Sequence, residues 1–204
     1  MPLPLPKLLA IGLSIGLALG SAGPAAAAAQ PASPLPVTPL AASPQAAPPV
    51  AAPPLAQAGG PEKLRIGAYL TNLGDFDPAK KSFSAAFWVW SVGPLDRVKS
   101  LDQLEFPNAI KVESPNAVQE TTAQGIWSQR KIVGSFRHGW DLRRFPFDRQ
   151  LLRIEMEEAE RDTASLVYVP DTANSSFDPE VNLSGWRILS TQLVTGSKPY
   201  HTSF

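Results

Sequence analysis

Apolar and polar residues alternate along several short runs between residue 64 and the end of the chain. Apolar residues stand at every second position from Leu64 to Leu70, and again from Phe83 to Val89. In the second run, Trp88 and Trp90 take the opposite face. A period of two predicts strands that each bury one face. The turn-forming residues of 72–78 between the two runs predict that these strands are joined by a turn.

The same pattern continues further along the chain. The runs Ala117–Thr122 and Gly125–Phe136 flank a two-residue link and predict an antiparallel pair of strands. Every second residue from Leu152 to Met156 is apolar, which predicts another inward face, with Glu155 and Glu157 pointing outward. A further strand is predicted at residues 166–170 and a loop at 171–184. Many short strands and no strong helix pattern predict an all-β fold, an immunoglobulin-like antiparallel β-sandwich.

The start of the chain has a different character. Lys7, the apolar run Leu8–Leu19 and the alanines before Gln30 are typical of a secretory signal peptide, which we place at residues 1–29. An uncleaved N-terminal anchor is the alternative, although the apolar run is short of the ~20 residues that a spanning helix needs. Residues 30–60 are rich in Pro and Ala and carry no charge, which predicts a disordered linker.

Composition limits the function of the remaining part, residues 61–204, which has the size of one domain. The whole chain has 18 basic and 18 acidic side chains, so no basic field for nucleic acid is expected. It has no cysteine, which fits an exported protein that does not rely on disulfides. No catalytic constellation, phosphate loop or metal-ligand spacing stands out among its residues. We therefore expect neither an enzyme nor a bound cofactor or metal.

The segment from Trp140 to Gln150 is the most distinctive motif. It contains Phe145-Pro146-Phe147-Asp148 between two predicted strands. Two Phe rings beside a proline cannot all be buried by so short a loop, so we expect at least one to contact something outside the sandwich. The alternative is an ordinary hairpin with a proline in its turn.

The motif resembles the signature loop of pentameric ligand-gated ion channels, the Cys-loop receptor superfamily. The match covers Phe145–Asp148 and Gln150, and the absence of cysteine is similar to the bacterial members. Gly185-Trp186 also resembles the family's Gly-Trp strand opening, and Trp90 matches a Trp common in the family. The resemblance implies the fold of the extracellular ligand-binding domain. The family's last strand and four membrane helices would not be in this chain, which we expect to be a fragment or a truncated product.

The resemblance also implies roles for particular residues. Trp90 and Trp186 are expected to be structural. A coupling loop, which passes a conformational change to the membrane domain, would consist of Asp75, Asp77, Phe145, Pro146, Phe147 and Asp148, although turn formation explains the two early aspartates equally well. A ligand site would include Phe106, Asn108, Glu158, Glu160, Asp162 and Tyr200.

The residues at that ligand site do not form an aromatic cage for a cationic amine. Ala85 stands at the position of one usual aromatic, and the segment 157–162 has carboxylates in place of another. Carboxylates could hold a cation through oxygen atoms, or sense protons by raising one another's pKa. The simpler interpretation of 157–162 is a solvated acidic turn.

The function implied is the sensing of a small ligand or protons outside the cytoplasmic membrane, by a homopentamer of identical subunits coupled to a pore that this chain lacks. One alternative is a stand-alone exported β-sandwich that binds a small molecule without channel activity. Another is a structural or adhesion domain carried on a Pro/Ala-rich stalk.

Overall fold

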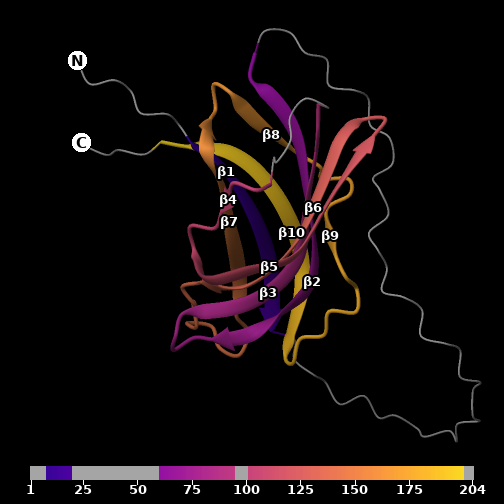
Figure 1. Ribbon diagram of the computed structural model, residues 1–204. Helices are drawn as coiled ribbons and strands as arrows, with labels where there is room; N and C mark the ends of the chain where they lie inside the picture. Colours follow the sequence, from indigo (N-terminus) through magenta and orange to yellow (C-terminus); the bar gives the residue numbers. More distant parts are fainter. Residues whose placement is uncertain (1–7, 20–59, 95–100, 200–204) are drawn as a thin grey trace, which may run out of the picture.

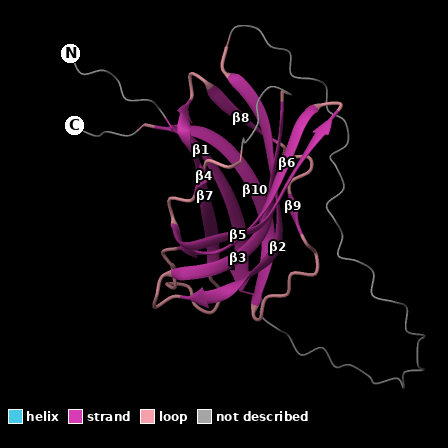
Figure 2. Cartoon of the chain, in the orientation of Figure 1, coloured by secondary structure: helices cyan, strands magenta, loops and turns pink. Residues whose placement is uncertain are grey.

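The computed structural model describes residues 8–19, 60–94 and 101–199. Within these ranges the regular elements are all strands (Figure 2). They are β1 (Leu8–Leu19), β2 (Glu62–Asp77), β3 (Ser82–Gly93), β4 (Leu104–Glu105), β5 (Ala109–Thr122), β6 (Gly125–Arg137), β7 (Arg149–Asp162), β8 (Leu166–Pro170), β9 (Ser176–Phe177) and β10 (Trp186–Lys198). Over those ranges no helix is long and apolar enough to cross a membrane.

The strands form two sheets that face each other, so the all-β sandwich predicted from the sequence is confirmed (Figure 1). One sheet has the order β10-β1-β7-β4, and the other has the order β5-β6-β3-β2-β8, with β9 also paired to β2. Most neighbours are antiparallel. The pairings of β2 with β8 and with β9 are parallel, which the sequence did not predict.

The core residues lie at the positions that the predicted alternation indicates. Leu64, Ile66 and Leu70 on β2 are buried, and Phe83, Phe87 and the other inward residues of the neighbouring strand β3 lie on the same inner face of the sheet. The inward face predicted for β7 is also correct, since Leu152, Ile154 and Met156 are each 0 % exposed. The hairpin of β5 and β6 forms around the predicted link, with Thr122 opposite Gly125. Burial of these aliphatic and aromatic faces is the main stabilising contribution of the sandwich.

Boundaries of β2, β5 and β7 differ from those predicted. Strand β5 begins at Ala109, well before the predicted start at Ala117. Strand β2 continues through most of the expected turn as far as Asp77, with two irregularities in its pairing to β3. Strand β7 continues to Asp162, so the predicted acidic turn at 157–162 is wrong. The reason is that Glu157 and Glu158 are buried, at 5 % and 0 % exposed, against the neighbouring strand β4. Glu157 is therefore not on a solvated outer face.

Trp90 is buried on the outer face of the larger sheet. It forms a small second cluster with Val92 and Trp127, covered in part by Tyr69. Its indole Nε1 donates a hydrogen bond to Asp171 Oδ2 at 3.4 Å. The structural role expected for Trp90 therefore has a physical basis, although its neighbours lie outside the main core between the sheets.

The segment Leu8–Leu19 forms β1, a central strand of the four-stranded sheet. Sequence analysis predicted this segment to be the apolar part of a signal peptide and the domain to begin at residue 61. The predicted cleavage region at 25–30 and most of the linker at 30–60 lie outside the described residues. Strand β1 is therefore part of the fold only if residues 8–19 are not removed from the chain.

Candidate functional site

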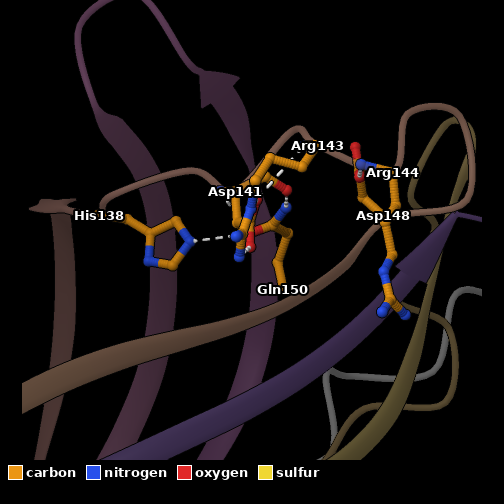
Figure 3. A network of polar contacts seen from close by, with 6 residues as sticks. All are labelled: His138, Asp141, Arg143, Arg144, Asp148 and Gln150. Carbon is orange, nitrogen blue, oxygen red and sulfur yellow. Dashed lines mark hydrogen bonds and ion pairs between the residues drawn. The ribbon is translucent and has the colours of Figure 1, made fainter.

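The connection between β6 and β7 contains the Phe-Pro-Phe-Asp motif and is held at its base by one glutamine. Gln150 Nε2 donates to the carbonyl oxygen of Asp141 at 2.7 Å, and Gln150 Oε1 accepts from the Asp141 N–H at 3.3 Å. The same Oε1 lies 3.4 Å from His138 Nε2 (Figure 3). Gln150 is 4 % exposed, so these contacts are shielded from water. The start and the end of the loop are thereby fixed to each other.

A second set of hydrogen bonds fixes the first part of the loop, between Asp141 and Arg143. The Arg143 guanidinium donates to both carboxylate oxygens of Asp141, at 2.8 and 2.6 Å, and the Arg143 N–H adds a third bond at 3.2 Å. These bonds, the side-chain ones first, lower the pKa of Asp141 to about 2. The pair is exposed, and such pairs add little to stability, so we assign it a role in loop shape.

The tip of the loop presents two Phe rings to solvent. Phe145 is 72 % exposed and Phe147 is 68 % exposed, which confirms that the loop does not bury its own aromatic rings. The peptide bond between Phe145 and Pro146 is cis. Below the tip, Asp148 is 1 % exposed, and its Oδ1 accepts the Arg144 N–H at 3.0 Å. A rigid base therefore carries an exposed apolar end.

An aromatic cluster joins this loop to two other parts of the chain. Trp140 from the loop contacts Phe76 near the end of β2, with ring centroids 5.6 Å apart, and Trp186 at the start of β10, at 6.1 Å. Phe76 and Trp186 are also in contact, at 5.8 Å. His138 stands edge-on to Trp140 at 4.8 Å. Burial lowers the pKa of His138, and its contact with Gln150 opposes that effect.

Sequence reasoning did not predict this cluster. It favoured a solvated side chain for His138, whose ring is instead half-buried against Trp140. Phe76 lies near the end of β2, whereas His138 and Trp140 both follow β6. Strand β3 pairs with β2 on one side and with β6 on the other, which brings the two segments together. The one available signal was that Trp140 begins the distinctive motif. Trp186, which was predicted to be structural, does pack here.

The two aspartates predicted in the coupling loop bond within their own turn. Asp75 Oδ2 accepts from Ser84 Oγ at 2.8 Å, and Asp77 Oδ1 accepts from the Lys80 N–H at 2.8 Å. The turn meets the β6–β7 loop through other groups, namely Phe76 and the Lys81 carbonyl oxygen, which accepts the His138 N–H at 2.8 Å. Turn formation, the alternative considered above, therefore describes the contacts of both aspartates.

A surface hollow lies beside the aromatic cluster. It has a volume of about 450 Å³ and is bounded by the segment 177–183 and the start of β10. Trp186, Phe177 and Ile188 provide apolar walls, and Glu180 and Arg187 provide charges of opposite sign. Sequence analysis named Trp186 but did not predict a hollow here.

The structure places Phe106 and Asn108 in structural positions. Phe106 packs on the main core beside Phe87 and Phe136, at centroid distances of 6.3 Å. Asn108 bonds to β7, since its Nδ2 donates to the Arg153 carbonyl at 2.8 Å and its Oδ1 accepts the Glu155 N–H at 2.9 Å. Its backbone carbonyl accepts the N–H of Arg137 on β6. Asn108 thus ties one sheet to the other.

The three acidic residues that were predicted to bind a ligand lie in different surroundings. Glu158 is 0 % exposed inside the sandwich, whereas Glu160 is exposed. Asp162 caps the turn before β8 by accepting the N–H groups of Ala164 and Ser165, each at 3.1 Å. In the described part of the chain, no three His, Asp or Glu side chains gather in a way that could hold a metal ion. Tyr200 lies outside the described residues.

Comparison with known proteins adds no relative: no protein-family model matches this sequence, and no curated protein is significantly similar to it.

Proposed function

We propose that this chain is the ligand- or proton-sensing domain of an exported protein of the pentameric ligand-gated channel type. It acts as one of five identical subunits and passes a conformational change through the β6–β7 loop to a membrane domain. The observation that carries the proposal is the pair of exposed rings, Phe145 and Phe147, on a loop with a rigid base. Apolar side chains held outward in this way are suited to contact another apolar surface.

The aromatic cluster supports this role because it offers a physical route to the loop. A small molecule in the hollow would contact Trp186, which packs on Trp140 and Phe76. Trp140 in turn contacts His138, and His138 meets Gln150 at the base of the loop. Contiguous packed side chains of this kind can transmit a shift between two arrangements.

Proton sensing has two candidate groups in the same molecule. His138 adjoins the loop base and has a pKa lowered by burial. Glu158 lies between the sheets and has a pKa raised by burial. Glu158 would change charge inside the sandwich, where a charge has a large energetic effect, and His138 would do so in a partly buried position at the loop base.

Site-specific photocrosslinking tests the proposed contact. A benzoylphenylalanine at Phe147 in the full chain, irradiated in the membranes of the cells that make it, should crosslink to an apolar membrane segment identified by mass spectrometry. The matched control places the same group at Val118, which is 42 % exposed on β5. Crosslinks to a membrane segment from position 147 and not from 118 support the proposal. Equal crosslinking from both positions, or none from 147, refutes it.

The hollow gives one observation in favour of a second function, a stand-alone exported sandwich that binds a small molecule. The hollow is formed within a single chain and combines apolar walls with one acidic and one basic side chain. In that case Phe147 should give no membrane crosslink, while Trp186→Ala should still abolish binding of the small molecule.

A further inference from the structure

Strand β1 fills a slot between two strands that have no pairing with each other. It lies between β10 and β7 and is antiparallel to both (Figure 1). Leu13 is paired with Leu193 on one side and with Ile154 on the other. In the described part of the chain, β7 and β10 are joined in the sheet only through β1. Without β1, both would present unpaired N–H and C=O groups along their length.

The inner face of the slot selects large aliphatic side chains. Leu13, Ile15 and Leu17 are 2 %, 0 % and 0 % exposed and belong to the main core. They extend the apolar layer made by β7, including Ile154. A strand that carried polar residues at these three positions would place them in the core without partners, which is costly.

The outer face of the slot leaves little room for a side chain at two positions. Gly12, Ser14, Gly16 and Ala18 alternate with the aliphatic residues. A Cβ at Gly16 would lie 2.9 Å from Ser190 Oγ, and one at Gly12 would lie 3.3 Å from Val194 Cγ2. The slot therefore accepts large aliphatic residues at 13, 15 and 17, and it leaves little room for a side chain at 12 and 16.

This strand is also the segment with the features of a signal peptide, and it is joined to β2 by residues 20–61. Antiparallel pairing with β10 on one side and β7 on the other aligns β1 residue by residue. The register of β1 is thus set by the slot itself. Removal of the segment during export would expose the edges of β7 and β10 and take Leu13, Ile15 and Leu17 out of the core.

We infer that the slot between β7 and β10 is a strand-acceptor site. In the unprocessed chain the segment 8–19 occupies it. In the processed protein it binds an extended strand of a partner polypeptide with the same alternation of large aliphatic and small residues. Backbone pairing on both sides provides affinity, and the alternating pockets provide specificity, as in other cases of strand addition. This inference depends on the predicted export but not on the channel role.

Peptide exchange in the full chain tests it. A protease site inserted after residue 40 is cut, and the cut protein is unfolded in urea and refolded with an excess of a labelled peptide of residues 8–19. The labelled peptide should be retained at one copy per protein and be displaced by unlabelled peptide. A peptide with Ile15→Asp should not be retained, and one with Gly16→Val should bind at least tenfold more weakly. Ser14→Val is the matched control on the same face and should bind within about twofold of the original.

A compensating change in the acceptor sharpens the test. Ser190→Gly removes the atom nearest to a Cβ at position 16, so it should restore most of the binding of the Gly16→Val peptide. Retention that does not distinguish these peptides would show non-specific association and overturn the inference. Failure of the refolded protein to retain any labelled peptide, while the uncut chain refolds, would overturn it as well. Export-processed protein that retains its cleaved 8–19 segment would overturn the claim that a partner strand replaces it.

Discussion

The hydroxyl of Tyr168 on β8 donates a hydrogen bond to Glu158 Oε2 on β7, 3.1 Å away, and so connects the two sheets inside the sandwich. The two residues are 1 % and 0 % exposed. Arg161 Nε lies 3.7 Å from the other carboxylate oxygen of Glu158. Burial raises the pKa of Glu158, while the Tyr168 hydrogen bond and the charge of Arg161 act in the opposite direction. Ionisation of Glu158 therefore costs more free energy in the folded protein than in the unfolded chain.

The first prediction is that Glu158→Gln stabilises the protein at pH 8. The unfolded chain releases the Glu158 proton near the ordinary pKa of 4.5, whereas the folded protein holds it to higher pH. The unfolded state then binds fewer protons between these two values, so the free energy of unfolding falls as pH rises through that window. The glutamine side chain of the Glu158→Gln variant does not titrate, so this fall in the free energy of unfolding is absent from the variant. We expect a gain of ~1 kcal/mol at pH 8 and little change at pH 4.

Urea unfolding across pH 4–8 measures this difference, and Glu160→Gln is the control on the same strand because Glu160 is exposed. Equal effects of the two substitutions, or a loss of stability at pH 8 with Glu158→Gln, would contradict the prediction.

The second prediction concerns Trp90 and Gly67, which lie opposite each other on β3 and β2. A Cβ added to Gly67 would lie 2.2 Å from the Trp90 indole, so Gly67→Ala should cost ~1–3 kcal/mol through overpacking. Trp90→Ala should cost ~3–5 kcal/mol. In the double variant, the methyl group added at position 67 meets open space and its cost should largely disappear. A double-mutant cycle in denaturant checks this. Additive effects would show that the two residues do not share this contact.

The sequence predicts the sandwich well wherever a strand buries only one face. The alternation from Phe83 to Val89 corresponds to β3, and the link at 123–124 corresponds to the β5–β6 hairpin. It does not predict the strand at Leu8–Leu19, because a short apolar run that follows a lysine is also typical of a signal peptide. The alternation of Leu13, Ile15 and Leu17 with smaller residues was the signal that could have indicated a strand.

The candidate site was less predictable for a related reason. The exposed rings of Phe145 and Phe147 follow from the motif itself, since a short loop cannot cover them. The burial of Glu158 depends on Tyr168, and the cluster around Trp140 depends on Phe76 and Trp186. Such partners are distant in the sequence, and no local pattern encodes their contact.

The third prediction concerns acid sensitivity at His138. Burial holds its pKa below the ordinary value of 6.5, so the unfolded chain takes up a proton at a higher pH than the folded one. The groups facing the ring are Phe83, Trp140 and Gln150, and none of these has a negative charge that would compensate a charged imidazole. The contribution of His138 to stability is complete above pH 6.5 and is lost as pH falls through its folded pKa.

His138→Gln should remove this component. Since the ring is only partly buried, we expect the wild type to lose less than ~1 kcal/mol relative to His138→Gln between pH 7 and 5. Parallel urea titrations in the Glu158→Gln background separate this loss from the opposite trend of Glu158. A wild type that gains stability relative to His138→Gln on acidification would show that the folded protein favours the charged ring.

The last prediction assigns opposite roles to two adjacent residues of the loop. Phe147 is 68 % exposed, so Phe147→Ser removes little buried surface and should change the free energy of unfolding by no more than about 0.5 kcal/mol. Asp148 is 1 % exposed and accepts the Arg144 N–H, so Asp148→Ala leaves that donor without its partner and should cost ~1 kcal/mol or more. Asp148→Asn keeps an acceptor oxygen and should cost less than Asp148→Ala. Urea unfolding of the three variants gives the order, and a large loss for Phe147→Ser alone would place its ring in the core. The crosslinking role proposed for Phe147 requires the predicted order, because a ring that stabilises its own fold is not free to contact a membrane domain.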